Sequence, residues 1–220
     1  RVLKKNTVFG MTWGRAMHEF VEQLAKDERL RSLSFQNVKV VPFLGTPGAI
    51  QSDSWNTTTY SNTLATKVGN LLHCASYNLS APMYVEGTKE KELIESIDEI
   101  AKVLHMAETA DIALIGIGSM QDDSSIIKAE IRTKEEYKEL VRKGAVGEIV
   151  GRIYDKNGQT VDEDLKRKMV GISLDKIAKI PVRVGMSYGK DKIEAIKGAI
   201  AGGLVNVLVT DVPTAELLLK

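Results

Sequence analysis

The stretch IALIGI, residues 112–117, is an unbroken apolar run with no alternation between apolar and polar side chains. Such a run is typical of a strand whose two faces are both buried, as in a parallel sheet covered by helices. Residues 205–209, VNVLV, show the same pattern with Asn206 as their one polar residue. Residues 182–186, VRVGM, are also strand-like, although Arg183 suggests that one face there is open. These three runs predict a largely parallel sheet.

Strand-like and helix-like patterns alternate along most of the chain. Further short strands are expected at residues 7–11, 38–44 and 83–85. Apolar residues at helical spacing follow the strands, at residues 17–24, 64–72, 93–104 (read as one long helix), 193–200 and 215–219. This order predicts an α/β fold with an open, mostly parallel, Rossmann-like sheet flanked by helices on both faces. No internal repeat or boundary is visible, so residues 1–220 are expected to form one domain.

The composition is that of an ordinary globular domain and excludes several classes of protein. Lys plus Arg is 30 and Asp plus Glu is 29, so the net charge is +1. A nucleic-acid-binding domain is expected to carry a clear excess of positive charge, so this balance argues against direct nucleic-acid binding. We interpret the short clusters Lys4-Lys5 and 166–168 as solvated surface. No apolar run approaches the ~20 residues of a membrane helix, and no signal peptide is evident. The single Cys74 cannot form an intramolecular disulfide, which is consistent with the cytoplasm. Because the chain opens on Arg1, we expect it to be part of a longer protein.

Ligands of open α/β sheets bind beyond the carboxyl ends of the strands, so the loops that follow the strands are the candidate sites. The first such loop is Gly10-Met11-Thr12-Trp13-Gly14-Arg15, which leads into a helix. Backbone N–H groups and the helix dipole favour an anion there, and Thr12 and Arg15 add donors. A tight turn with Thr12 as the helix cap is an equally good interpretation.

Two further glycine-bearing loops follow strands. Gly45-Thr46-Pro47-Gly48 opens a polar stretch that runs to Asn56, and it is either a functional loop or an ordinary surface loop. Gly116-Ile117-Gly118-Ser119 resembles a dinucleotide fingerprint only in part, because Gln121 stands where the third glycine is needed. We therefore expect no dinucleotide cofactor, while a close approach of this backbone to a small ligand is plausible chemistry.

Isolated charged residues add little to this pattern. Glu148 and Asp155 have an odd separation, so on a regular strand they would point to opposite faces, which argues against a paired acid–base role. Asp211 is either the N-cap of the last helix or a ligand contact. Lys192 can meet a phosphate or be a solvated first-turn residue. The histidines, His18, His73 and His105, lack metal-ligand spacing, so no metal site is expected.

Five segments together resemble the SorC family of sugar-responsive bacterial regulators. They are GAVGEIVGRIYDKNG (144–158), DIALIGIGS (111–119), NVLVTDVPTAELLL (206–219), MTWGRAM (11–17) and SNTLA (61–65). They occur in the family's order and span nearly the whole chain. The resemblance implies an effector-binding domain without catalytic activity, with a fold similar to phosphosugar isomerases and deaminases.

The resemblance also implies partners. The effector is a phosphorylated sugar, no cofactor is involved, and family members form homodimers or homotetramers. DNA is bound through a helix-turn-helix, which we expect to precede this chain together with the start of the effector domain. One branch of the family uses a lysine after the second strand to form a Schiff base with its sugar. Leu44 stands at that place here, so we predict non-covalent binding.

Carried over by position, the resemblance implies a set of ligand-binding residues. They are Thr12, Trp13, Gly14, Arg15, Gly45, Thr46, Asn62, Gly116, Gly118, Glu148, Asp155 and Lys192. Where the family commonly has two consecutive glycines, this chain has Gly45-Thr46 and Tyr188-Gly189. A tyrosine at the rim of the pocket would narrow or re-shape it.

Two other functions remain open at the level of sequence. An isomerase- or deaminase-like enzyme would share the fold and would need a base near the sugar, for which Glu148 is the candidate. A purely structural oligomerisation domain would leave its polar cleft empty.

Overall fold

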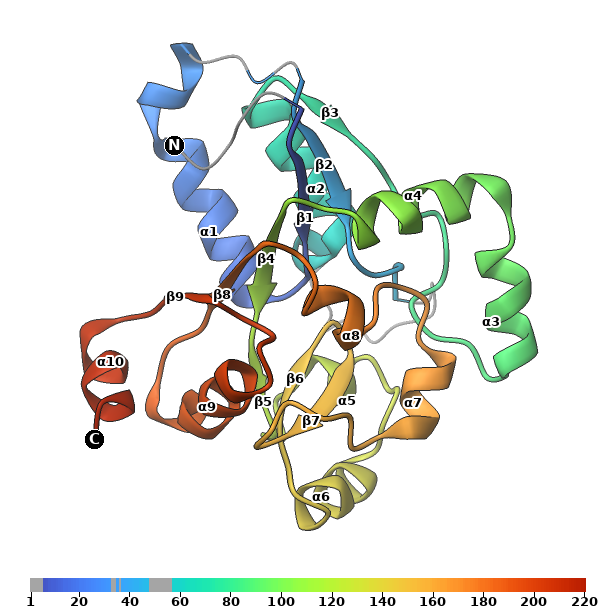
Figure 1. The fold of residues 1–220 in the computed structure, drawn as a ribbon, viewed down its shortest axis with the longest axis vertical. Coiled ribbons are helices and arrows are strands. Elements are labelled where there is room, and N and C mark those ends of the chain that lie inside the picture. Colours follow the sequence, from blue (N-terminus) through green and yellow to red (C-terminus); the bar gives the residue numbers. More distant parts are fainter. Residues whose placement is uncertain (1–5, 33–34, 36, 48–56) are drawn as a thin grey trace.

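A computed structural model describes residues 6–32, 35, 37–47 and 57–220. The main sheet in this part of the chain has six strands, all paired in parallel. They are β1 (Val8–Met11), β2 (Lys39–Pro42), β3 (Ala75–Ser76), β4 (Ile112–Gly116), β8 (Val182–Met186) and β9 (Val207–Val209). Their order is β3-β2-β1-β4-β8-β9, which confirms the predicted open parallel sheet (Figure 1). The strand order reverses between β1 and β4, so this is the sheet's topological switch point.

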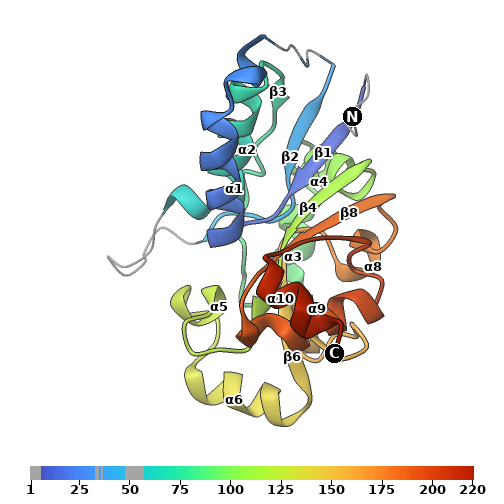
Figure 2. The same cartoon turned by 90° about the vertical axis from the view of Figure 1, so that its left-hand side faces the viewer.

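Helices cover both faces of this sheet (Figure 2). α1 (Arg15–Lys26) and α2 (Ser61–Leu71) lie on one face, and α4 (Asp98–Glu108) lies on the other. Within β4, Ile112 and Leu114 pack into the core below α1 and α2, whereas Ala113 and Ile115 pack into the core below α4. Both faces of β4 are therefore buried, which explains why apolar and polar residues do not alternate in its sequence.

A second, three-stranded antiparallel sheet lies beyond the carboxyl ends of the main strands. It contains β5 (Gly118–Ser119), β6 (Ala145–Ile149) and β7 (Arg152–Asp155), in the order β5-β6-β7. The β6–β7 turn places Val150 at φ 54° and Gly151 at φ 68°, the left-handed pair that a tight hairpin requires. Glu148 and Asp155 therefore do not lie on one regular strand, and their odd separation does not set the faces to which they point, because the chain reverses at Val150-Gly151.

Three other expectations need correction. Residues 83–85 form no strand, because Tyr84 makes only an isolated bridge to Met169. The helix expected over residues 93–104 is two helices, α3 (Thr88–Glu95) and α4, separated at Ile97, whose extended backbone starts α4. Thr12 is not a helix cap, since α1 begins after Gly14.

The prediction for Asp211 is confirmed. Its carboxylate accepts a hydrogen bond of 2.9 Å from the Thr214 N–H and caps α10 (Val212–Leu218). The remaining helices are α5 (Ser125–Lys128), α6 (Lys134–Arg142), α7 (Glu163–Lys168), α8 (Leu174–Ile177) and α9 (Ile193–Ala201), with short 3-10 turns at Glu28–Ser32, Thr57–Thr59 and Lys190–Lys192.

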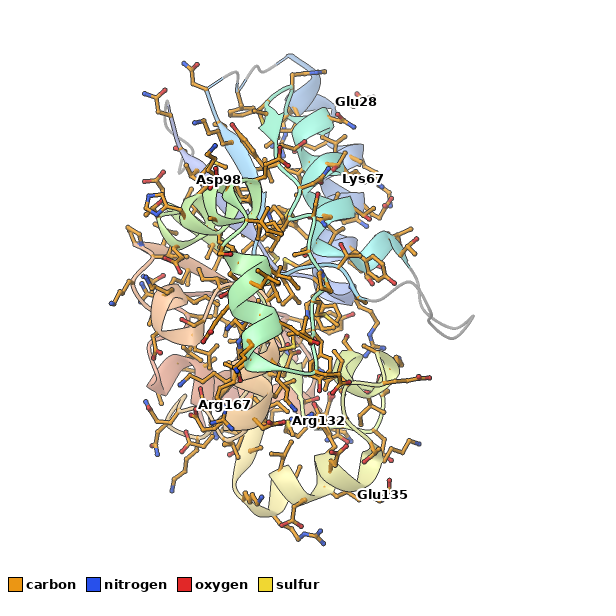
Figure 3. The ribbon with its side chains drawn as sticks, turned by 90° about the vertical axis from the view of Figure 1, so that its right-hand side faces the viewer. Glu28, Lys67, Asp98, Arg132, Glu135 and Arg167 are labelled. Carbon is orange, nitrogen blue, oxygen red and sulfur yellow. The ribbon has the colours of Figure 1, made fainter. Side chains whose placement is uncertain are left out.

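The charged residues labelled in Figure 3, of both signs, lie on separate elements along the length of the molecule. In the cluster at residues 166–168, Lys166 pairs with Glu163, and Arg167 and Lys168 both pair with Asp164. Among the described residues no helix is long and apolar enough to cross a membrane. The same residues contain no group of three or more side chains able to hold a metal ion.

Candidate functional site

A cavity of about 380 Å³ lies where β1, β4 and β8 end. Three loops build its walls: Trp13–Ala16 after β1, residues 116–119 after β4, and residues 187–192 after β8. Glu148 of β6 and the start of α5 complete it. The cavity therefore sits at the switch point between β1 and β4, where open parallel sheets place their ligands.

The loop after β1 turns the start of α1 toward this cavity. Gly14 adopts φ 108°, a conformation that favours glycine, and it is the N-cap without any side-chain hydrogen bond to the helix. The first intrahelical hydrogen bond runs from the His18 N–H to the Gly14 carbonyl. The backbone N–H groups of residues 15–17, in the first turn, therefore have no acceptor within the helix. In Figure 2 this first turn points toward α5 and the small sheet. The result is a helix N-terminus with a positive dipole end beside the cavity.

Arg15 supplies an exposed cation at the same place. Its guanidinium lies 2.7 Å from Asp123, and the two side chains are 71% and 54% exposed. Burial raises the pKa of Asp123, but the hydrogen bond from Arg15 and the charges of Arg15, Lys128 and Lys192 together outweigh it and lower that pKa overall. An exposed pair of this kind contributes only about 0–1 kcal/mol, so an incoming anion can replace Asp123 as the partner of Arg15 at little cost.

The loop after β4 forms the floor of the cavity and has no room for larger residues. A Cβ atom on Gly116 would lie 3.2 Å from the Trp13 carbonyl oxygen, and one on Gly118 would lie 2.8 Å from Glu148 Oε2. The Gly116 N–H donates to Thr12 Oγ1 over 2.9 Å, so Thr12 ties the two loops together from beneath. The glycines therefore allow close approach of neighbouring protein segments.

Lys192 is the second cation, placed by the loop after β8. Its ammonium donates to Ser119 Oγ over 2.9 Å and lies 3.8 Å from Asp191. The loop is anchored because Ser187 Oγ donates to the Ile117 carbonyl over 3.1 Å. Lys192 therefore reaches the floor of the cavity from the opposite side of the switch point.

Glu148 is a buried carboxylate in the wall, only 6% exposed. It accepts hydrogen bonds from the Gly151 N–H at the hairpin turn and from the Trp13 side chain. Burial raises the pKa of Glu148, while these hydrogen bonds and the charges of Lys192 and Arg152 act in the opposite direction. Glu148 is thus held rigidly by two loops and is partly protonated at higher pH than an exposed carboxyl would be.

Arg152 lies behind Glu148 and is 2% exposed. It donates to the carbonyls of Val150, Met169 and Gly171, which fixes the hairpin to the segment after α7. Burial lowers the pKa of Arg152 to about 10, against the charges of Glu95 and Glu148. Its role is to hold the β6–β7 hairpin, and therefore Glu148, in place.

Seven of the twelve residues predicted for the site line this cavity, and Thr12 lies directly beneath it. The seven are Trp13, Gly14, Arg15, Gly116, Gly118, Glu148 and Lys192.

Four predicted residues are placed elsewhere. Gly45 and Thr46 are bound to the segment 79–83 and to Val170, and Asn62 donates to Thr46 Oγ1 over 2.8 Å. The Asp155 carboxylate accepts the N–H groups of Asn157 and Gln159 in its own turn. Backbone groups of Gly45 and Thr46 and the side chains of Asn62 and Asp155 thus bond to other parts of the protein, and none of the four residues lines the cavity. Gly48 and the polar stretch to Asn56 lie outside the described residues.

Sequence reasoning missed several polar residues of the cavity. Asp123, Ser124 and Ser125 line it from the start of α5, and Asp191 lines it beside Lys192. The run DDSS, residues 122–125, was a visible signal because hydroxyl residues just before a helix are typical N-caps. Ser124 does cap α5 by accepting a bond from the Ile127 N–H.

A comparison with protein families identifies this architecture. The family model "Putative sugar-binding domain" matches residues 1–220. The chain belongs to this family, as a sugar-binding domain of SorC-type transcriptional regulators. It is 30% identical over 222 residues to the sorbitol operon regulator of Klebsiella pneumoniae, covering 100% of the chain and 67% of that protein. It is 35% identical over 159 residues to the transcriptional regulator LsrR of Escherichia coli O9:H4, covering 70% of the chain and 50% of LsrR.

Solved structures agree with the family. The crystal structure of the full-length sorbitol operon regulator SorC from Klebsiella pneumoniae has a TM-score of 0.87 to this chain, covering 99% of the chain and 68% of SorC. The chain spans about two thirds of the sorbitol operon regulator and about half of LsrR. These relatives are named as regulators, which supports a regulatory rather than an enzymatic role for this domain.

Proposed function

We propose that this domain senses a phosphorylated sugar, which it binds non-covalently in the cavity at the ends of β1, β4 and β8. The observation that carries the proposal is the convergence of an uncapped helix N-terminus with Arg15 and Lys192 on one cavity. Helix N-termini and cations together favour a phosphate, which is a dianion able to accept several hydrogen bonds. Both cations are now paired with protein oxygen atoms that a phosphate could replace.

The carbohydrate part of the ligand would meet a different set of groups. Glu148 and Ser119 supply acceptors and a hydroxyl to which sugar hydroxyl groups can bind. Because Glu148 is fixed by Trp13 and the Gly151 N–H, its position is set before the ligand arrives. Leu44 is fully buried and carries no amine, which supports binding without a Schiff base at that position.

The proposal extends to the whole regulator. We propose that residues 1–220 act as the effector domain of a longer cytoplasmic protein, a homodimer or homotetramer that binds DNA through a helix-turn-helix. A ligand that binds more tightly to one arrangement of the loops or subunits shifts the population of the DNA-competent state. Operator affinity would then change by the ratio of the two ligand affinities.

Thermal unfolding with a panel of sugar phosphates tests this function. A ligand at 100-fold over its Kd should stabilise the domain by about 2.7 kcal/mol, and its unphosphorylated sugar should have a much smaller effect. The sugar phosphate should be recovered unchanged after incubation. If no sugar phosphate shifts unfolding at millimolar concentration, or if product accumulates and is lost in Glu148→Gln, the proposal is wrong.

A further inference from the structure

Tyr188 is the part of the cavity that the proposed phosphate chemistry does not use. It follows β8 directly, lines the cavity and is 63% exposed. Among the large apolar side chains that are exposed in the described part of the chain, it is the one aromatic residue. A tyrosine ring has a large apolar face, so a ring that is exposed at the mouth of a cavity is available to contact a bound ligand.

The backbone around Tyr188 is fixed on both sides. The Ser187 N–H donates to the Val209 carbonyl over 3.3 Å, and Ser187 Oγ donates to the Ile117 carbonyl over 3.1 Å. On the other side, the Gly189 N–H donates to Thr214 Oγ1 over 2.8 Å, and Thr214 is 1% exposed. The ring is therefore presented by a rigid main chain, while the ring itself remains in solvent.

Gly189 makes this presentation possible. Its φ of 104° is a conformation that a side chain strains, and a Cβ atom there would lie 2.8 Å from Asp191 Oδ1. The turn at Gly189 leads directly into the segment that carries Lys192, whose N–H donates to the Gly189 carbonyl. Tyr188 and Lys192 are thus held by the same short segment, one supplying a flat apolar face and the other a cation.

The other apolar groups of the cavity offer no comparable face. Trp13 and Ile117 are each 5% exposed, and the Trp13 side chain is bound to Glu148. A cyclic sugar has a polar edge of hydroxyl groups and an apolar face of C–H groups. Polar groups of the cavity walls can form hydrogen bonds with the hydroxyl groups at the edge. The C–H face needs a flat apolar partner instead, such as an aromatic ring.

We propose that Tyr188 is a specificity-determining residue that covers the C–H face of a cyclic sugar phosphate and so favours ring sugars over acyclic phosphates. This inference rests on the proposed function. The contribution comes from removing the ring of Tyr188 and the face of the sugar from water together, so the phenolic hydroxyl is not needed.

The test measures ligand affinity by titration calorimetry for the wild type and for Tyr188→Ala, Tyr188→Leu and Tyr188→Phe. The probes are fructose phosphate and glucosamine phosphate as cyclic ligands, glycerol phosphate as an acyclic ligand, and inorganic phosphate. For the tighter of the two cyclic ligands, Tyr188→Ala should weaken binding about tenfold, equal to about 1.4 kcal/mol. Tyr188→Phe should bind within about twofold of the wild type, and Tyr188→Leu should fall between them. Glycerol phosphate and inorganic phosphate should bind all four proteins equally.

Three outcomes overturn the inference. The first is unchanged affinity of Tyr188→Ala for the cyclic ligand, and the second is an equal loss for all phosphates, which would indicate a structural role. The third is a change in oligomeric state by sedimentation without a change in affinity, which would assign the ring to a protein contact. Melting temperatures of the free variants control for folding. Failure of the wild type to bind any probe overturns the proposed function itself, and this inference with it.

Discussion

The loops that follow β1 and β2 carry similar sequence signals but have different surroundings. Each follows a buried parallel strand and contains a glycine within two residues of a threonine. The β1 loop opens onto the cavity through Trp13, Gly14 and Arg15. The β2 loop is filled by the protein itself, since Gly45 and Thr46 are bonded to other segments of the chain. Glycine and hydroxyl residues therefore mark close approach in both loops, and the fold decides whether the approaching group is protein or ligand.

The difference arises from the positions of the two strands in the sheet. β1 lies beside β4 at the switch point, where the connections leave in opposite directions and a space remains between them. β2 lies away from that point, and the chain at residues 79–83 returns across its end. Substitutions in the two loops should therefore affect different properties.

The largest effect is expected for Gly45→Ala in the filled loop. Its Cβ atom would lie 2.6 Å from the carbonyl oxygens of Ala81 and Pro82, which are backbone atoms and cannot move cheaply. Overpacking of this kind should lower the free energy of unfolding by about 3 kcal/mol in urea denaturation. Gly87→Ala is the matched control, because the nearest atom to its Cβ would be 3.8 Å away, and it should cost about 1 kcal/mol or less. If both variants lost the same amount of unfolding free energy, Gly45 would not be packed tightly against Ala81 and Pro82.

Asn62→Ala should have the next largest effect on stability. The amide of Asn62 bonds to Thr46 Oγ1, to the Leu79 carbonyl and to the Leu79 N–H over 2.8, 3.0 and 2.9 Å. Its loss leaves part-buried polar groups unsatisfied and should cost about 2 kcal/mol of unfolding free energy. The Kd for a sugar phosphate should stay within about twofold in the folded variant. A large loss of affinity at unchanged stability would place Asn62 in the ligand site after all.

Arg15→Gln in the open loop should show the reverse pattern. Because the Arg15–Asp123 pair is exposed, its loss should change unfolding free energy by less than about 1 kcal/mol. Loss of a cation from the phosphate site should raise the Kd for a sugar phosphate about tenfold, as measured by calorimetry. Arg167→Gln, which removes a surface guanidinium on α7 paired with Asp164, is the control and should leave the Kd unchanged. Equal Kd values for the two variants would remove Arg15 from the proposed site.

The smallest effect is expected from Glu148→Gln and concerns pH. Burial raises the pKa of Glu148 above its ordinary value of 4.5. At a pH between these two pKa values, the carboxyl is protonated in the native state and ionised in the unfolded state. The free energy of unfolding therefore falls as the pH rises from the ordinary pKa of the carboxyl toward its raised native pKa. Glu148→Gln should flatten this part of the profile, seen by urea denaturation between about pH 4 and 8. Parallel profiles for the two proteins would mean that Glu148 is not protonated preferentially in the native state.

Much of the fold could be read from the sequence because local pattern and tertiary environment agree. The run at residues 112–117 predicts a buried strand, and both faces of β4 are indeed covered. The second sheet was missed because its strands are short and because the first residue of its turn, Val150, is not the Asn, Asp or Gly that usually precedes glycine in a tight hairpin. The helix over residues 93–104 was read as continuous because apolar spacing alone does not reveal the break at Ile97.

The candidate site was predicted in part for a similar reason. Arg15 and Lys192 are 177 residues apart in sequence, yet both follow strands whose carboxyl ends meet at the switch point. The positional rule for parallel sheets identified them. Asp155 does not line the cavity, because its carboxylate accepts N–H groups of its own turn, a local competition that a motif match does not show.

The sequence by itself determined the parallel sheet and the loops that had to be searched for a ligand, because burial and strand order leave regular patterns in the chain. The family of sugar-binding domains was indicated separately, by the resemblance of five motifs. Only the tertiary structure decided which of these loops is open. That choice depends on which distant segment crosses the end of each strand, and no local pattern encodes it. Residues 79–83 cover the described start of the loop after β2, at Gly45 and Thr46, whereas the loop after β1 is left facing Lys192 and Glu148 across a cavity.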